Sequence, residues 1–210
     1  MGYNGAYTAK KDERRNSGVK IGLSTAAFYG RWEVEEAAAH IGGYGAECAE
    51  VFLQTRSEYT RSFARLVRAN LGGVPCTSVH PFGTGFENEF FARSARQRAD
   101  ALDTLRHVLD AAAELGAHLY VYHGRYSPAR VELPFEPQRN AEILTLMQAE
   151  ADKRDIRIAW ENVCWCQLTT PERVREMRRL LPEIRFTLDI KQAMRARCDP
   201  MDFADAMGPQ

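Results

Sequence analysis

The sequence predicts an α/β fold, a parallel (β/α) barrel of which this chain supplies six of the usual eight units. Short apolar segments alternate six times with longer segments of helical periodicity, an order typical of parallel βαβ units. Several of the apolar segments end on a His, Glu or Asp, so polar side chains from distant parts of the chain are expected at one edge of the sheet. No G-x-G-x-x-G motif follows the first strand, which disfavours a dinucleotide-binding fold.

The predicted elements follow one another as strand–helix pairs. Strands are expected over residues 19–25, 45–53, 74–80, 117–123, 156–161 and 185–189. Helices are expected over residues 31–42, 57–70, 92–115 and 137–153, with two more that begin at Pro171 and Pro200. The apolar faces of the second and fourth helices include Leu66 and Leu146, and residues 81–89 are expected to form a loop.

Two regions are expected within the 210 residues. Residues 1–18 form a polar lead-in that is expected to be disordered, and residues 19–210 form the barrel domain, truncated before strands seven and eight. An open barrel would expose two strand edges, which soluble proteins avoid. We therefore expect either a missing C-terminal segment or a homo-oligomer to complete the barrel.

The composition restricts the partners and the compartment. The chain has 28 basic and 28 acidic residues, and this balance argues against nucleic acid as a partner. No run of about 18 apolar residues indicates a membrane span, and the N-terminus lacks a signal-peptide core. Five cysteines, an odd number, indicate reduced thiols in the cytoplasm.

Four predicted strands end on side chains that could bind a metal or exchange a proton: His80, His123, Glu161 and Asp189. Parallel strands would bring these residues to one pocket. A buried carboxylate such as Glu161 is costly without a partner, so metal ligation or general-base work is weighed against a structural hydrogen bond or a helix cap, and the same holds for Asp189. Each His could instead be a satisfied core residue.

Three further positions accompany these strand ends. Glu50 lies inside the second predicted strand, where it either lines the pocket or orients a neighbouring His. Lys191 is a candidate contact for an anionic or hydroxyl-rich substrate. The segment Cys164-Trp165-Cys166 could be a soft metal clip, but the other candidate ligands are oxygen and nitrogen donors, so two buried or half-buried cysteines after a strand are the preferred interpretation.

The strand ends carry a family resemblance. The runs Glu50-Val-Phe, Ser78-Val-His80, Tyr122-His123-Gly, Trp160-Glu161-Asn-Val and Leu188-Asp189-Ile-Lys-Gln192-Ala resemble the xylose isomerase-like TIM barrel superfamily, over about residues 19–207. It includes sugar phosphate isomerases and epimerases and endonuclease IV (AP endonuclease family 2). The resemblance implies that Glu161 and Asp189 bind a divalent metal ion: Mn, Mg, Co or Zn. Gln192, a candidate pocket residue, stands where members commonly have a His.

The resemblance also implies a function. We expect a metal-dependent isomerase or epimerase of a small sugar or sugar phosphate, which removes a proton next to a carbonyl through an enediol-type intermediate, with Glu161 as the catalytic residue. Phe82, Trp160 and Trp165 are candidates for stacking on a sugar, with core packing preferred for Trp160. Two alternatives stay open: an endonuclease IV-like phosphodiesterase on abasic DNA, or a non-catalytic, incomplete barrel. The balanced charge and Gln192 count against the nuclease.

Overall fold

The structure, a computed structural model, describes residues 18–82, 85–126 and 134–209. It contains a six-stranded parallel sheet in the order β1-β2-β3-β4-β5-β6, which confirms the predicted fold class. The strands are β1 (Gly22–Ser24), β2 (Cys48–Leu53), β3 (Cys76–Pro81), β4 (Leu119–Tyr122), β5 (Arg157–Glu161) and β6 (Arg185–Thr187). The predicted lead-in lies outside the described residues, apart from Gly18.

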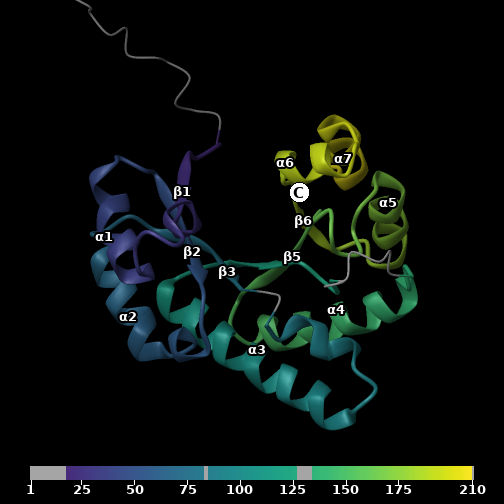
Figure 1. Ribbon diagram of the computed structural model, residues 1–210, viewed down its shortest axis with the longest axis horizontal. Coiled ribbons are helices and arrows are strands. Elements are labelled where there is room, and N and C mark those ends of the chain that lie inside the picture. The colour runs from purple at the N-terminus through teal and green to yellow at the C-terminus, as the bar shows by residue number, and fades with distance from the viewer. Residues whose placement is uncertain (1–17, 83–84, 127–133, 210) are drawn as a thin grey trace, which may run out of the picture.

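The main helices cover the outside of the curved sheet (Figure 1). They are α1 (Val34–Gly43), α2 (Arg61–Asn70), α3 (Ala95–Leu115), α4 (Pro137–Asp152), α5 (Pro171–Leu180) and α7 (Pro200–Met207). Shorter elements that the sequence did not predict are η1 (Thr25–Phe28), η2 (Arg56–Glu58), η3 (Glu87–Phe91) and α6 (Ile190–Arg195). The expected loop over residues 81–89 is thus partly wrong, because its last residues belong to a 3-10 helix.

The main core lies between the helices and the sheet. Leu105 and Leu109 of α3 and Met147 of α4 are fully buried there. Leu66 and Leu146 were expected on inward faces, but their exposed fractions are 47% and 45%. Both lie at the edge of an apolar stripe, and helical periodicity alone does not say how far round the helix the packing extends.

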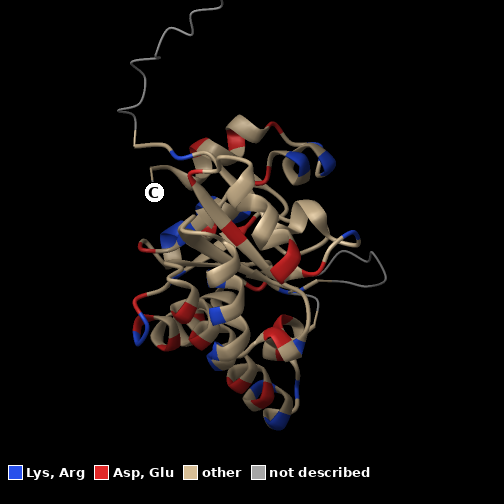
Figure 2. Cartoon of the chain, turned by 90° about the vertical axis from the view of Figure 1, so that its left-hand side faces the viewer, with Lys and Arg blue, Asp and Glu red and all other residues tan. Residues whose placement is uncertain are grey.

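The sheet ends at β1 on one side and β6 on the other, and no described strand pairs with their outer edges. Exposed apolar side chains lie beside both ends: Ile21 before β1, and Ile190 and Met194 on α6. None of the described helices is long and apolar enough to cross a membrane. Acidic and basic positions are interleaved along the helices in the view of Figure 2.

A buried acid joins two of the outer helices. Glu150 of α4 accepts hydrogen bonds from Arg106 of α3 and from Lys153, each at 2.9 Å. The side chain of Glu150 is only 9% exposed. The hydrogen bond from Arg106, with that from Lys153, lowers the pKa of Glu150 to about 2.

We expect Glu150→Gln to lower the free energy of unfolding by about 1–2 kcal/mol at neutral pH, since it removes a charge pair that solvent screens only in part. Because the folded-state pKa is depressed, the wild-type advantage is present above about pH 4.5 and is lost as the pH falls toward about 2. Urea unfolding across this range measures it. Glu142→Gln, at an exposed position of the same helix, is the control, and an equal loss in the control would contradict the prediction.

Candidate active site

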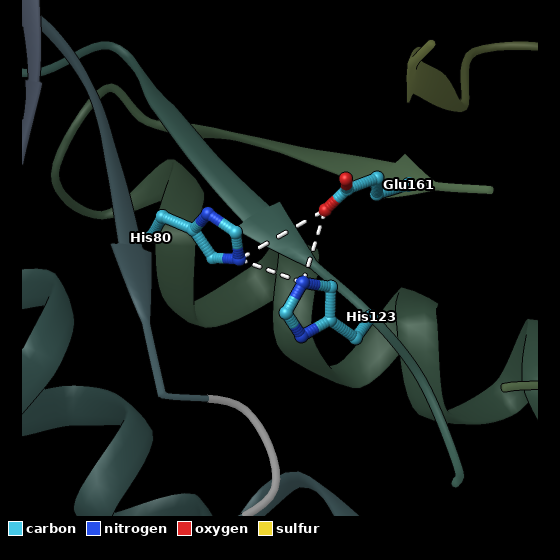
Figure 3. A group of neighbouring side chains, drawn as sticks. All are labelled: His80, His123 and Glu161. Atoms are coloured by element: carbon cyan, nitrogen blue, oxygen red, sulfur yellow. Dashed lines mark hydrogen bonds and ion pairs between the residues drawn. The ribbon is translucent and has the colours of Figure 1, made fainter. Parts of the chain in front are cut away.

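Three of the predicted site residues meet at the carboxyl edge of the sheet: His80, His123 and Glu161 (Figure 3). The Nε2 atoms of the two imidazoles are 2.6 Å apart. Glu161 Oε2 lies 3.0 Å from Nε2 of His123 and 3.8 Å from Nε2 of His80. These atoms all lie within 4.8 Å of one another, so three side chains from three parts of the sequence face one point.

Strand register explains this meeting. Tyr122 of β4 pairs with Trp160 of β5, so the next residues, His123 and Glu161, come side by side at the end of the sheet. His80 is the second-last residue of β3, which lies on the other side of β4. Side chains alternate between the two faces of a sheet, and at these three positions they lie on the same face, so they project toward a common centre.

The group has the properties of a cation site. Glu161 Oε2 is buried and accepts no hydrogen bond from the described residues, although His123 Nε2 lies 3.0 Å away as an ion-pair partner. A buried carboxylate oxygen without a donor is costly, and a cation between it and the two Nε2 atoms would satisfy it. Two imidazoles and a carboxylate are also ordinary ligands for a divalent metal. The residues present therefore fit a metal ion.

Glu50 supports His80 from behind. Its Oε1 lies 3.6 Å from His80 Nδ1, the ring nitrogen that faces away from the cluster. Its two oxygens also accept hydrogen bonds from Ser24 (2.9 Å) and Ser78 (3.0 Å). Burial alone would raise the pKa of Glu50, but the interactions with His80 and the two hydroxyls lower it. A carboxylate behind a histidine fixes the ring orientation and makes Nε2 a better ligand.

His123 and Glu161 form a charge pair. Burial opposes ionisation of Glu161, but His123 more than compensates and lowers its pKa. Burial likewise lowers the pKa of His123, but the close contact with Glu161 and the charges of Glu87 and Glu161 raise it above its ordinary value. The pair is thus favoured as imidazolium and carboxylate when protons are the only cations available.

Asp189 lies beside this cluster, outside the group of three. It follows β6 as the N-cap of α6, where Oδ1 accepts the Gln192 N–H at 2.8 Å. Its backbone is held by the Asn162 amide, which accepts the Asp189 N–H (2.7 Å) and donates to its carbonyl (2.9 Å). The neighbouring Asp189 side chain also contributes, less than His123 does, to the lowered Glu161 pKa. Its role as a metal ligand stays a prediction.

The remaining predicted residues lie around α6 and the aromatic side of the site. Lys191 is exposed, whereas Gln192 is buried and its amide oxygen lies 3.4 Å from the Cys164 N–H. Phe82 is 39% exposed and lies next to Phe52, which contacts the His80 ring. These positions leave the predicted substrate contacts untested.

The tryptophans and cysteines near β5 differ in exposure. Trp160 is fully buried, in agreement with the core packing expected for it, and Trp165 is 38% exposed. All five cysteines are free, and burial raises the pKa of Cys166.

One acid at this site was missed by the sequence analysis. Glu87 is fully buried and accepts the backbone N–H of His123 at 3.1 Å. Burial raises its pKa, although His123 and Tyr120 act in the opposite direction. The signal in the sequence was weak: an acid among phenylalanines (Phe86, Phe90 and Phe91) in a segment that was expected to be a loop.

Comparison with known families agrees with this architecture. The profile of the xylose isomerase-like TIM barrel family matches residues 13–210, so the chain belongs to that family. Among curated proteins no match was found.

Solved structures with the same fold include several proteins whose names refer to sugar chemistry. A D-tagatose 3-epimerase-like protein has a TM-score of 0.71 at 19% identity, over 90% of this chain and 71% of that one. A sugar phosphate isomerase/epimerase from Parabacteroides distasonis has a TM-score of 0.63 at 16% identity, over 92% and 73%. The IOLI protein, solved with a zinc atom, has a TM-score of 0.66 at 13% identity, over 88% and 67%. Against a D-psicose 3-epimerase, the alignment spans 60% of the other protein. At these low identities, the structural similarity shows a shared fold.

Proposed function

We propose that this protein is a metal-dependent isomerase or epimerase that acts on a small sugar or sugar phosphate. The observation that carries the proposal is the group of His80, His123 and Glu161, with a buried, unsatisfied carboxylate oxygen, at the carboxyl edge of a parallel sheet. That edge is where barrels of this type place their chemistry. Membership of the family and the sugar epimerases among the solved structures of the same fold support the substrate class.

The residues divide the work as follows. His80, His123 and Glu161 would hold the metal ion, and Asp189 is proposed as a further ligand. When bound, a divalent cation supplies positive charge that makes a proton next to a substrate carbonyl easier to remove. Glu161 would take up and return that proton, because an ionised carboxylate at hydrogen-bonding distance from the substrate is a competent general base. Two imidazoles among the ligands favour Zn, Co or Mn over Mg.

The surroundings of the centre complete the proposal. Lys191 and Gln192 on α6 are proposed to contact the carbohydrate, with the exposed face of Phe82 stacking on it. We also propose that a further segment or a second copy of the chain covers the outer edges of β1 and β6. The five free cysteines are compatible with the proposed cytoplasmic location.

Exchange of deuterium from heavy water tests the proposal. The chain is incubated with ketoses and their phosphates, with Co²⁺, Mn²⁺, Zn²⁺ or chelator, and label is measured at the carbon next to the carbonyl. We expect metal-dependent incorporation for at least one substrate. Incision of abasic DNA without exchange on any sugar would transfer the assignment to a phosphodiesterase. The absence of both activities would favour a non-catalytic barrel.

A further inference from the structure

Glu87 has a place in the structure that the proposed catalytic roles do not explain. It begins η3 in the connection from β3 to α3, and its side chain is completely buried. Oε1 accepts a hydrogen bond from the Tyr120 hydroxyl at 2.8 Å, and Oε2 accepts one from the backbone N–H of His123 at 3.1 Å. Burying an acid is costly, so a buried Glu with partners on one strand and at its end indicates a specific task.

Other side chains hold the same short segment beyond β4. The indole N–H of Trp160 donates to the His123 carbonyl at 3.1 Å. Asn88, next to Glu87, uses both ends of its amide on Tyr126: its oxygen accepts the Tyr126 N–H at 2.9 Å, and its nitrogen donates to the Tyr126 carbonyl at 3.3 Å. The backbone of His123 is therefore fixed on both sides by buried side chains, where the strand itself has ended.

Gly124, between His123 and Tyr126, packs too closely on Trp160 for the backbone to shift far. Gly124 has φ 83°, a conformation that favours glycine, and a Cβ atom there would lie 3.0 Å from Trp160 Nε1. The indole thus packs directly on the backbone that follows His123. Trp160 thus holds the carbonyl of His123, and Glu87 of η3 holds its N–H.

We propose that Glu87 is a positioning residue for the candidate metal centre. By fixing the His123 backbone, it sets the place of the imidazole relative to His80 and Glu161. The consequence for metal affinity rests on the proposed function, whereas the backbone attachment does not.

A crossed pair of variants separates the length of the side chain from the presence of a carboxyl group. Glu87→Asp keeps the carboxyl group but shortens the side chain, and we expect it to weaken Co²⁺ binding about 10- to 100-fold, the range for outer partners of metal ligands. Glu87→Gln replaces the carboxyl group by an amide but keeps an oxygen within reach of the His123 N–H, and its affinity should stay within about threefold of wild type. Tyr120→Phe, which removes the other hydrogen bond of Glu87, is the control and should behave like Glu87→Gln. Titration of the full chain with Co²⁺, followed by visible absorption, measures all four proteins, and circular dichroism checks that each is folded.

Amide hydrogen exchange in the chelated protein provides a reading without metal. The His123 N–H should exchange at least about tenfold faster in Glu87→Asp than in wild type, and at a rate close to wild type in the other two variants. Wild-type affinity and slow exchange in Glu87→Asp would overturn the proposal, as would a larger loss of affinity in Glu87→Gln than in Glu87→Asp. If wild type binds no Co²⁺, the metal-dependent function fails, and the exchange rates still decide whether Glu87 fixes His123.

Discussion

Glu161→Gln is expected to lower metal-dependent deuterium exchange by about a thousandfold or more, because the amide cannot take up the substrate proton and no longer brings a negative charge to the cation. The side chain keeps its shape, so the fold should be preserved. The substitution also removes the negative charge that lies 3.0 Å from His123 Nε2. Exchange rates with saturating Co²⁺ measure the loss of proton transfer, and Co²⁺ titration measures the loss of binding separately.

Two neighbouring acids provide the comparison. Asp189→Asn retains an oxygen for the cap of α6 and should weaken metal binding first, with slower exchange only below saturation. Glu50→Gln acts through His80 and should cost about 10- to 100-fold in metal affinity. If Glu161→Gln kept more than about a tenth of wild-type exchange at saturating metal, Glu161 could not be the base assigned to it.

The order of strands and main helices was predictable because local signals agree with it in each of the six units. In β5, the buried apolar run Ile158-Ala159-Trp160 ends at a polar residue, Glu161, and Gly116 adopts the left-handed conformation that closes α3. Parallel strands all end at the same edge, and this topological fact alone brings His80, His123 and Glu161 together. The convergence of these three could therefore be anticipated without knowing any distance.

What the sequence did not reveal depends on contacts between distant segments. Glu87 looks like a loop acid until the fold places it 3.1 Å from a peptide nitrogen 36 residues further along the chain. Asp189 follows a short strand, and its carboxylate caps the N-terminus of α6. The sequence could not decide between a helix cap and a metal ligand, because both place an acid directly after a strand. The exposure of Leu146 likewise depends on how neighbouring helices pack, which periodicity does not specify.

Replacing His123 by Gln is expected to weaken Co²⁺ affinity by about two orders of magnitude or more, because it removes one of three converging ligand atoms. Gln fills similar space and leaves the backbone bonds to Glu87 and Trp160 in place. His107→Gln, at an exposed position of α3, is the matched control and should bind as wild type does. Equal affinities for both variants would exclude His123 from the site.

The contribution of His123 to stability should fall with rising pH in the chelated protein and rise with pH when Co²⁺ is bound. In the chelated protein the His123 pKa is raised, so its pairing with Glu161 stabilises the fold below about pH 6.5, and this contribution is lost as the pH rises through the raised value. A metal ion needs the neutral imidazole, so the extra stability that Co²⁺ provides should instead grow as the pH rises through that value. Melting temperatures from about pH 5.5 to 8.5, with Co²⁺ and with chelator, measure both trends. His123→Gln should flatten both curves, and a wild-type protein whose two curves run parallel would show that protons and metal do not compete for this imidazole.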